Sequence, residues 1–373
     1  MKKSFLALAV AALAATSIAS TASAATVYDK DGNSLAVYGR VQSVLYSDKA
    51  NGVADDAATI STSARLGVDM RSQLTSGIAA FAKAEWEGAN GDGPAEAEGD
   101  DHFKTRYLWV GVDFGQYGSV KVGKFEPAIK YAIGQTDIFD DWGCAGLIGN
   151  DDKREGVVQY QWSGYGFDAI ASYVFAKNGE HIDGAYEIAE TADMDSTVSL
   201  ALGYTSPDVV FGPIAVRAGF EHGEFSDTKT NEVTSGVKTV AYDSYDQFAA
   251  GLSWGSLDLG PYIAAVYQQR EFSSKAITAD TPSPDAKVSG YEFAVGYSFA
   301  NGITARAGYN TKKYEIDGEG EVKGANVPVY VNFQINPQFN VWGEACFDAS
   351  SDVGAHDVKV DENVYSAGIR YVF

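Results

Sequence analysis

The chain has 373 residues, and its 50 acidic against 28 basic side chains give a formal charge of −22, which excludes a nucleic-acid binder driven by bulk charge. With 45% hydrophobic and 21% charged residues it is expected to fold. The 2 cysteines and 4 histidines argue against a disulfide scaffold and a histidine-rich metal site, whereas 22 tyrosines and 19 phenylalanines favour β-structure.

Residues 1–24 have the pattern of a secretory signal peptide. Two lysines precede an apolar stretch from Phe5 to Ala15, and the segment ends in the cleavage pattern Ala22-Ser23-Ala24. A membrane anchor is the alternative, but it needs about 20 apolar residues. We therefore expect export, and a mature chain of residues 25–373 with a formal charge of −24 after the loss of the two lysines.

Beyond residue 24, apolar and polar side chains alternate in segments of about ten residues, as expected for outer-membrane strands. No apolar run there is long enough for a spanning helix, so a membrane protein of this sequence has to cross as a closed β-barrel. In residues 64–74, Leu66 and Met70 share one face, and Arg65, Asp69 and Arg71 share the other. A soluble β-sandwich also alternates, but it would not usually bury two arginines and an aspartate on one strand face.

The pattern predicts an even number of strands, sixteen, joined alternately by short turns and long, acidic loops. This asymmetry is typical of outer-membrane barrels, and sixteen strands with their loops and turns account for the length of the chain without a second domain. The expected strands are residues 35–46, 64–74, 78–86, 103–114, 117–126, 155–163, 167–176, 197–205, 213–221, 243–254, 257–270, 288–299, 303–314, 326–335, 339–347 and 364–373.

In order and spacing, motifs along the whole mature chain resemble those of a known family. The chain is similar to the general trimeric porins of the Gram-negative outer membrane in Val37-Tyr38-Gly39-Arg40, Ala64-Arg65-Leu66-Gly67, Lys104-Thr105-Arg106 and residues 118–124. The terminal Phe373 resembles the signal by which the assembly machinery recognises such barrels. The resemblance implies a 16-stranded antiparallel transmembrane barrel with short periplasmic turns, long extracellular loops and an infolded third loop.

The third long loop narrows the pore in this family, and here it corresponds to residues 126–152. By resemblance of residues 136–143 to the family's loop segment, Asp137 and Asp141 are the acids that line the pore. Asp140 stands where the family usually has proline, so it either adds a third carboxylate or changes the turn. The alternative is that these acids are solvated surface charge.

The family also places basic side chains on the barrel wall across the pore. The matching positions are all occupied here, by Arg40, Arg65, Arg106 and Arg154, with Lys104 beside them. Opposed rows of charge across a narrow aqueous pore would orient dipolar solutes and disfavour apolar ones. Any one arginine could instead be a surface charge paired with a nearby acid.

The two cysteines depart from the family, which usually has none. Cys144 follows the loop tip, and Cys346 has the strand parity of Glu344, which matches a lumen-facing family acid. An exported chain meets an oxidising compartment, so we predict a Cys144–Cys346 disulfide that pins the loop. The alternative is two free thiols, and Cα atoms more than about 7 Å apart would exclude the bond.

No metal, cofactor or catalytic site is expected. The histidines are far apart in sequence and lack paired metal-ligand spacing. Residues 29–33 faintly resemble a calcium loop but lack the glutamate that such a loop requires, so a turn is the better interpretation. Acidic outer loops could bind divalent cations next to lipopolysaccharide, although solvation is favoured.

Three functional hypotheses follow for an outer-membrane protein of a Gram-negative bacterium. The first is a channel for passive diffusion of small hydrophilic solutes and ions, filtered by size and charge, and not an enzyme. The second is a solute-specific channel, which would need a lysine cluster or an aromatic slide, and the third is a structural or adhesive protein. The resemblance implies a homotrimer in contact with lipid and lipopolysaccharide, with the loop of residues 87–101 as the trimer latch. Weak cation selectivity is expected from the acidic mouths.

Overall fold

The computed structural model describes residues 24–47, 58–90, 103–143, 153–180, 182, 192–228, 232–235, 238–276, 285–316, 320–350 and 363–373. The expected signal peptide therefore lies almost wholly outside the described residues, as does the last third of the third long loop, residues 144–152.

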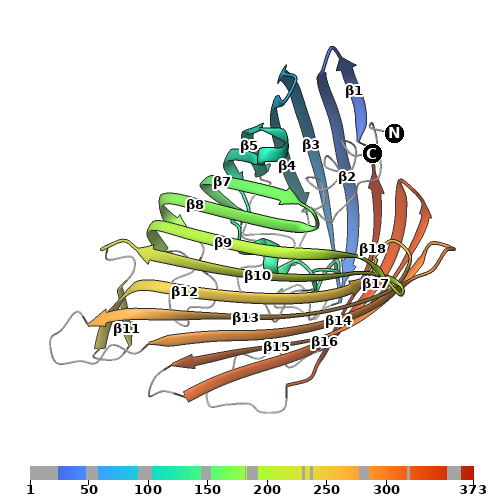
Figure 1. The fold of residues 1–373 in the computed structure, drawn as a ribbon. Coiled ribbons are helices and arrows are strands. Elements are labelled where there is room, and N and C mark those ends of the chain that lie inside the picture. The colour runs from blue at the N-terminus through green and yellow to red at the C-terminus, as the bar shows by residue number, and fades with distance from the viewer. Residues whose placement is uncertain are drawn as a thin grey trace.

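The strands form one antiparallel sheet that closes on itself (Figure 1). The sixteen barrel strands are β2 (Asn33–Tyr46), β3 (Thr59–Thr75), β4 (Ile78–Asn90), β5 (Lys104–Asp113), β6 (Ser119–Phe125), β7 (Arg154–Gly164), β8 (Phe167–Glu180), β9 (Ala192–Val209), β10 (Gly212–Phe225), β12 (Lys238–Gly255), β13 (Gly260–Ala276), β14 (Ala286–Ser298), β15 (Ile303–Ile316), β16 (Gly320–Asn336), β17 (Phe339–Asp348) and β18 (Val364–Val372). Every predicted strand has its counterpart, so the expected 16-stranded barrel is confirmed.

The barrel closes where β18 pairs with β2, from Ser366 opposite Tyr46 to Val372 opposite Arg40. The short strand β1 (Ala25–Lys30) continues the line of β18 along the same edge of β2, which it joins by a tight hairpin. Asp31 and Gly32 both have positive φ in that hairpin, at 54° and 74°, as a two-residue turn with the twist of the strands requires. The turn expected in residues 29–33 is therefore confirmed.

Two further elements are small. β11 (Glu232–Ser235) pairs with the extension of β12 beyond the barrel, and the 3-10 helix η2 (Gly115–Tyr117) forms the turn between β5 and β6. The helix α2 (Lys130–Ile133) belongs to the third long loop and packs against β9, β10, β12 and β13. Figure 1 shows it within the curve of the strands. None of the helices in the described part of the chain has the length and apolarity of a membrane-crossing helix.

The two faces of the barrel wall differ as the alternation predicts. In β9, Leu200 and Leu202 point outward and are 50% and 65% exposed, whereas Ser199 of the same strand points inward and is buried. The same division continues around the ring, which gives an apolar outer band suited to lipid and a polar inner wall. Outward aromatic pairs mark the rim near the short turns: Phe167 with Tyr204, Phe211 with Trp254, and Tyr297 with Phe299.

Candidate functional site

The third long loop leaves β6 and lies against the inner wall of the barrel. Its first turn is held by two serines that point into the lumen: the Ala128 N–H donates to Ser172 Oγ at 2.9 Å, and the Ile129 N–H donates to Ser199 Oγ at 2.7 Å. The helix α2 then buries Ala132 and Ile133 against Ala249 and Val266 of β12 and β13. These contacts turn the loop inward immediately after β6.

The middle of the loop continues along the wall through side-chain hydrogen bonds. Gln135 Nε2 donates to Ser253 Oγ at 2.9 Å, and the Tyr262 hydroxyl donates to the Gln135 carbonyl at 2.8 Å. The Thr136 hydroxyl donates to the Glu292 carboxylate at 2.6 Å, which carries the loop from β13 to β14. Each contact satisfies a buried polar group, so the path of the loop is fixed by the wall it crosses.

Glycines on the inner wall make room for the loop. A Cβ on Gly219 would lie 2.8 Å from Ile129 Cδ1, and one on Gly251 would lie 2.7 Å from the Ala132 carbonyl oxygen. Further along, a Cβ on Gly308 would lie 3.1 Å from the Phe139 ring. Larger residues at the first two positions would collide with the loop, so these glycines allow its close approach.

The tip of the loop is anchored to the carboxylate of Glu344 on β17. The backbone N–H groups of Asp140 and Asp141 donate to Glu344 Oε2, both at 3.0 Å, and that of Trp142 donates to Oε1 at 2.7 Å. Glu344 is only 3% exposed. Three consecutive amides therefore share one carboxylate, a compact anion site made by the loop backbone.

Asp140 adds an ion pair to this anchor. Its carboxylate lies 2.6 Å from Arg370 of β18 and accepts a 2.6 Å hydrogen bond from the Tyr330 hydroxyl of β16. Burial alone would raise the pKa of Asp140, but Arg370, Tyr330 and the more distant Arg40 outweigh it and hold that pKa below its ordinary value. Asp140 thus stays charged and fastens the tip.

Asp141 is held against the wall by three donors. Its carboxylate accepts from Ser366 at 2.5 Å, from the Trp342 indole at 3.0 Å and from the Tyr46 hydroxyl at 3.1 Å. Burial raises the pKa of Asp141, and the nearby Asp140 charge adds to the rise against these hydrogen bonds. Asp140 and Asp141, both predicted to line the pore, therefore anchor the loop tip.

Asp137 differs from the other two predicted acids. Its side chain is 44% exposed, and its carboxylate lies 3.3 Å from Lys130 Nζ within the same loop. An exposed pair of this kind contributes little to stability. The Asp137 side chain is thus more exposed than that of Asp140, which is 20% exposed.

Three of the predicted basic residues meet on the part of the inner wall where none of the loop contacts described above is made. Arg65 Nε lies 2.6 Å from Glu87, and Arg106 bridges Glu85 at 2.9 Å and Glu87 at 2.6 Å. Arg40 Nη2 lies 3.7 Å from Glu87. We call Arg40, Arg65 and Arg106 the arginine cluster. Three guanidinium groups around two carboxylates leave an excess of positive charge.

A β-bulge aims Arg106 at the lumen. Glu85 pairs with Tyr107 and Trp86 pairs with Thr105, so Arg106 is the extra residue of β5. Without the bulge, Arg106 would share the outward face of Leu108, which is 55% exposed. Lys104, the other basic residue predicted here, pairs with the lumen-facing Glu87 and is exposed.

Arg154 occupies a different environment from the cluster. It is 2% exposed, lies 3.1 Å from the fully buried Glu221 of β10 and donates to the Tyr245 hydroxyl at 3.2 Å. The expectation of a pore-wall residue therefore differs from the structure, because Arg154 points into a buried polar network that extends through Tyr245 to Arg270 of β13 and Gln247 of β12. Sequence parity alone cannot separate these two environments.

The cysteine prediction stays open. Cys346 is buried on the lumen face of β17, opposite Pro328 and Val364. Cys144 lies outside the described residues, so the bond to Cys346 remains a prediction. At the other end of the wall, Phe373 exchanges two backbone hydrogen bonds with Gly39, at 2.9 and 3.0 Å, and its role as an assembly signal also remains a prediction.

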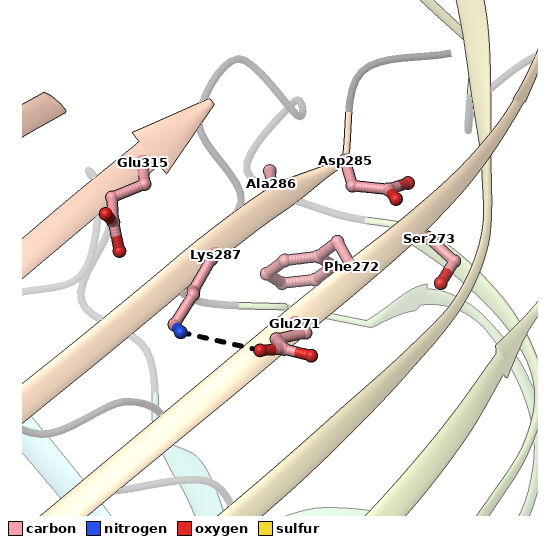
Figure 2. A pocket seen from close by; sticks show the side chains of 7 residues that line it. All are labelled: Glu271, Phe272, Ser273, Asp285, Ala286, Lys287 and Glu315. Atoms are coloured by element: carbon pink, nitrogen blue, oxygen red, sulfur yellow. Dashed lines mark ion pairs between the residues drawn. The ribbon is translucent and has the colours of Figure 1, made fainter. Parts of the chain in front are cut away.

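Outside the lumen, Figure 2 shows a pocket near the loop ends of β13, β14 and β15. Glu271 and Lys287 form a 3.5 Å ion pair there, with Asp285 and Glu315 nearby. Glu271, Lys287 and Glu315 occupy outward register positions, and the exposed pair fits the expectation of solvated charge. Within the described ranges, no group of three or more histidines, cysteines and acids could hold a metal ion.

Comparison with known proteins places this geometry in a family. Residues 9–261 match the model of the Gram-negative porin family. The outer membrane porin protein OmpD of Salmonella typhimurium is 27% identical over 400 residues that cover 100% of both chains. The structure of Salmonella typhi OmpF in complex with daunomycin has a TM-score of 0.70 at 17% identity and covers 94% of this chain and 100% of its own. The trimer form of OmpT, an outer membrane protein of Vibrio cholerae, has a TM-score of 0.67 at 20% identity, with 92% and 100% covered.

A polar-lined closed barrel, an apolar outer band and a loop that runs along the inner wall are the features that a passive pore requires. The chain therefore belongs to the Gram-negative porin family and is an outer-membrane channel for the passive diffusion of small hydrophilic solutes and ions.

Proposed function

We propose that the anchored loop and the arginine cluster form the filter of this channel, which selects solutes by size and charge. The observation that carries the proposal is the division of the inner wall. The loop follows the wall from β8 to β18 and reaches Tyr46 at the end of β2, and Arg40, Arg65 and Arg106 stand beyond it on β2, β3 and β5. Solutes then pass between the loop, with Asp137 exposed, and the cluster. Charges in so narrow an aqueous space act with weak screening.

The test is single-channel conductance in a planar bilayer, with the reversal potential recorded under a salt gradient. Arg65→Gln removes one charge of the cluster, and Arg71→Gln is its matched control, because both side chains lie on the lumen face of β3 and Arg71 stands nearer the short turns. We expect Arg65→Gln to raise the cation-to-anion permeability ratio about twofold, and Arg71→Gln to change it less. A folded barrel without conductance, or equal shifts in both variants, would contradict the proposal.

In this proposal the channel is not an enzyme, because the filter residues attract or repel solutes and hold no reaction geometry. A solute that crosses liposomes bearing the protein should be recovered chemically unchanged. Conversion of the solute by the purified protein would contradict a purely passive role.

We also propose a homotrimer in contact with outer-membrane lipid and lipopolysaccharide. The similarity to the trimer form of OmpT supports the assembly, and the apolar outer band of the barrel supports the lipid contact. The candidate latch, residues 87–101, lies mostly outside the described residues. The mass of the folded protein in mild detergent tests the assembly: three chains are expected, and a monomer at all concentrations would refute it.

A further inference from the structure

On the short-turn side of the arginine cluster, the lumen wall carries lysines set among aromatic rings. Lys83 is the lumen-facing residue of β4 next to Glu85, and it pairs with Trp109 of β5. Lys121 of β6 pairs with Gly111, the next lumen-facing residue of β5. Lys83 and Lys121 therefore flank the same stretch of β5 on the inner wall.

Both ammonium groups rest on ring faces. Lys83 Nζ lies 4.7 Å from the centre of the Tyr38 ring and 5.6 Å from that of Tyr107. Lys121 Nζ lies 4.1 Å from the centre of Phe125 and 5.5 Å from that of Trp109. Ring faces attract a cation but accept only weak hydrogen bonds, so the N–H donors of both lysines keep most of their capacity.

The carboxylates nearby use only part of that capacity. Asp69 forms an ion pair with Lys83, but its oxygen lies 3.6 Å from Nζ, which is longer than a good hydrogen bond. No carboxylate of the described residues lies within 4.0 Å of Lys121 Nζ. Glu126 is the acid at the end of this wall, and it accepts from the Tyr107 hydroxyl at 2.5 Å and pairs with Lys153 at 3.5 Å. The half-buried charge of Lys121 therefore lacks a described counter-ion.

We propose that this wall is a subsite for the carboxylate of a small organic anion, with Lys121 and Lys83 as its donors and Trp109 as an apolar face for the body of the solute. The inference rests on the proposed function, since solutes must reach the wall through an open lumen. A planar body covers an indole ring better than a compact aliphatic one, so the subsite favours aromatic monocarboxylates. An anion that leaves the arginine cluster meets this second pair of cations next.

Benzoate is the probe, and the measurement is the concentration that halves the chloride conductance of the intact channel in a planar bilayer. Lys121→Gln should raise that concentration about fivefold, because one charged donor is lost from a partly hydrated site. Lys124→Gln is the matched control: Lys124 lies on the same strand but on the outer face, 3.1 Å from Glu155, and its loss should leave the value unchanged. Lys121→Arg keeps the charge and should keep benzoate block within about twofold.

A second comparison tests the ring. Trp109→Leu should weaken block by benzoate several-fold more than block by cyclohexanecarboxylate, which has the same charge without a planar body. Equal benzoate block in Lys121→Gln and Lys124→Gln would overturn the subsite while the channel still conducts. A parent protein that never conducts would instead overturn the proposed function. If Lys121→Gln fails to fold, the Lys121→Arg and Trp109→Leu barrels still decide the question.

Discussion

Removal of the Glu344 carboxylate should release the tip of the third loop from the wall. This carboxylate accepts three backbone hydrogen bonds, from Asp140, Asp141 and Trp142, at 2.7–3.0 Å. A hydrogen bond contributes roughly 0.5–1.5 kcal/mol net, so the loss of three in Glu344→Ala should cost the anchored tip roughly 3 kcal/mol.

Hydrogen exchange of residues 140–142 in the detergent-solubilised barrel measures this cost directly. A loss of roughly 3 kcal/mol accelerates exchange through local opening about 100-fold. Glu344→Gln keeps one oxygen, which can still accept from Asp140 and Asp141 but leaves an amide donor facing the Trp142 N–H, so an acceleration of about tenfold is expected. The tip amides should respond, and the strand amides of β6 should not.

Gln161→Ala is the control for Glu344→Ala, because Gln161 is also a long, buried, lumen-facing side chain but lies on β7, far around the wall from the tip. It should leave exchange at residues 140–142 unchanged. The reasoning fails if Glu344→Ala exchanges at the parent rate, or if both alanine variants accelerate the tip equally.

Three further changes test other contacts of the lumen. In the native chain, Asp140 has a pKa below its unfolded-state value, so it stabilises the tip above that value. This contribution is lost only as pH falls through the lower folded value, so the part of tip protection that Asp140 supplies should hold from about pH 7 to 4.5. In Arg370→Gln, burial dominates and raises that pKa, so protection should be lower at neutral pH and recover as pH falls. Gly251→Ala brings a Cβ to 2.7 Å from the loop backbone and should lower stability by roughly 1–3 kcal/mol in thermal unfolding. Arg154→Gln leaves the buried Glu221 without its ion-pair partner and should lower stability by roughly 3–5 kcal/mol in the same assay without changing ion selectivity.

Each of these variants has its own control. An unchanged pH profile in Arg370→Gln would show that Tyr330 and Arg40 suffice to hold the Asp140 charge. Gly343→Ala points a methyl group toward open space on the outer face of β17, so equal destabilisation there would remove the steric explanation for Gly251. The double change of Arg154 and Glu221 to glutamine should regain part of the lost stability, and failure to do so would count against their pairing.

The barrel was predictable because its signal is local. Alternation with period two needs only neighbouring residues, and the sixteen strands follow from it in order. The strand ends toward the long loops were less predictable: β9 begins at Ala192 where the pattern indicates 197, and β12 begins at Lys238 where it indicates 243. Beyond the apolar band both faces of a strand meet water, so polarity no longer alternates although the backbone pairing continues.

The site was less predictable because its contacts are distant in sequence. Asp140 and Asp141 are recognised as loop acids, but their role as anchors depends on Glu344 and Arg370, more than 200 residues later. Arg106 shows a second limit, since strict parity places it with Leu108 on the lipid face and the bulge reverses it. A charged residue on an otherwise apolar face is the signal that could have indicated the bulge.

The charge of the whole chain and the field inside the pore are separate quantities. The formal charge of −22 reflects acids gathered in the long loops, and at physiological salt exposed charges are largely screened beyond about 8 Å. On the wall of β2 to β5, Arg40, Arg65 and Arg106 outnumber Glu85 and Glu87, and the low-dielectric barrel behind them keeps their field strong in the lumen. In the proposed filter, the excess positive charge of this wall, rather than the net charge of the chain, is therefore expected to set which ions cross.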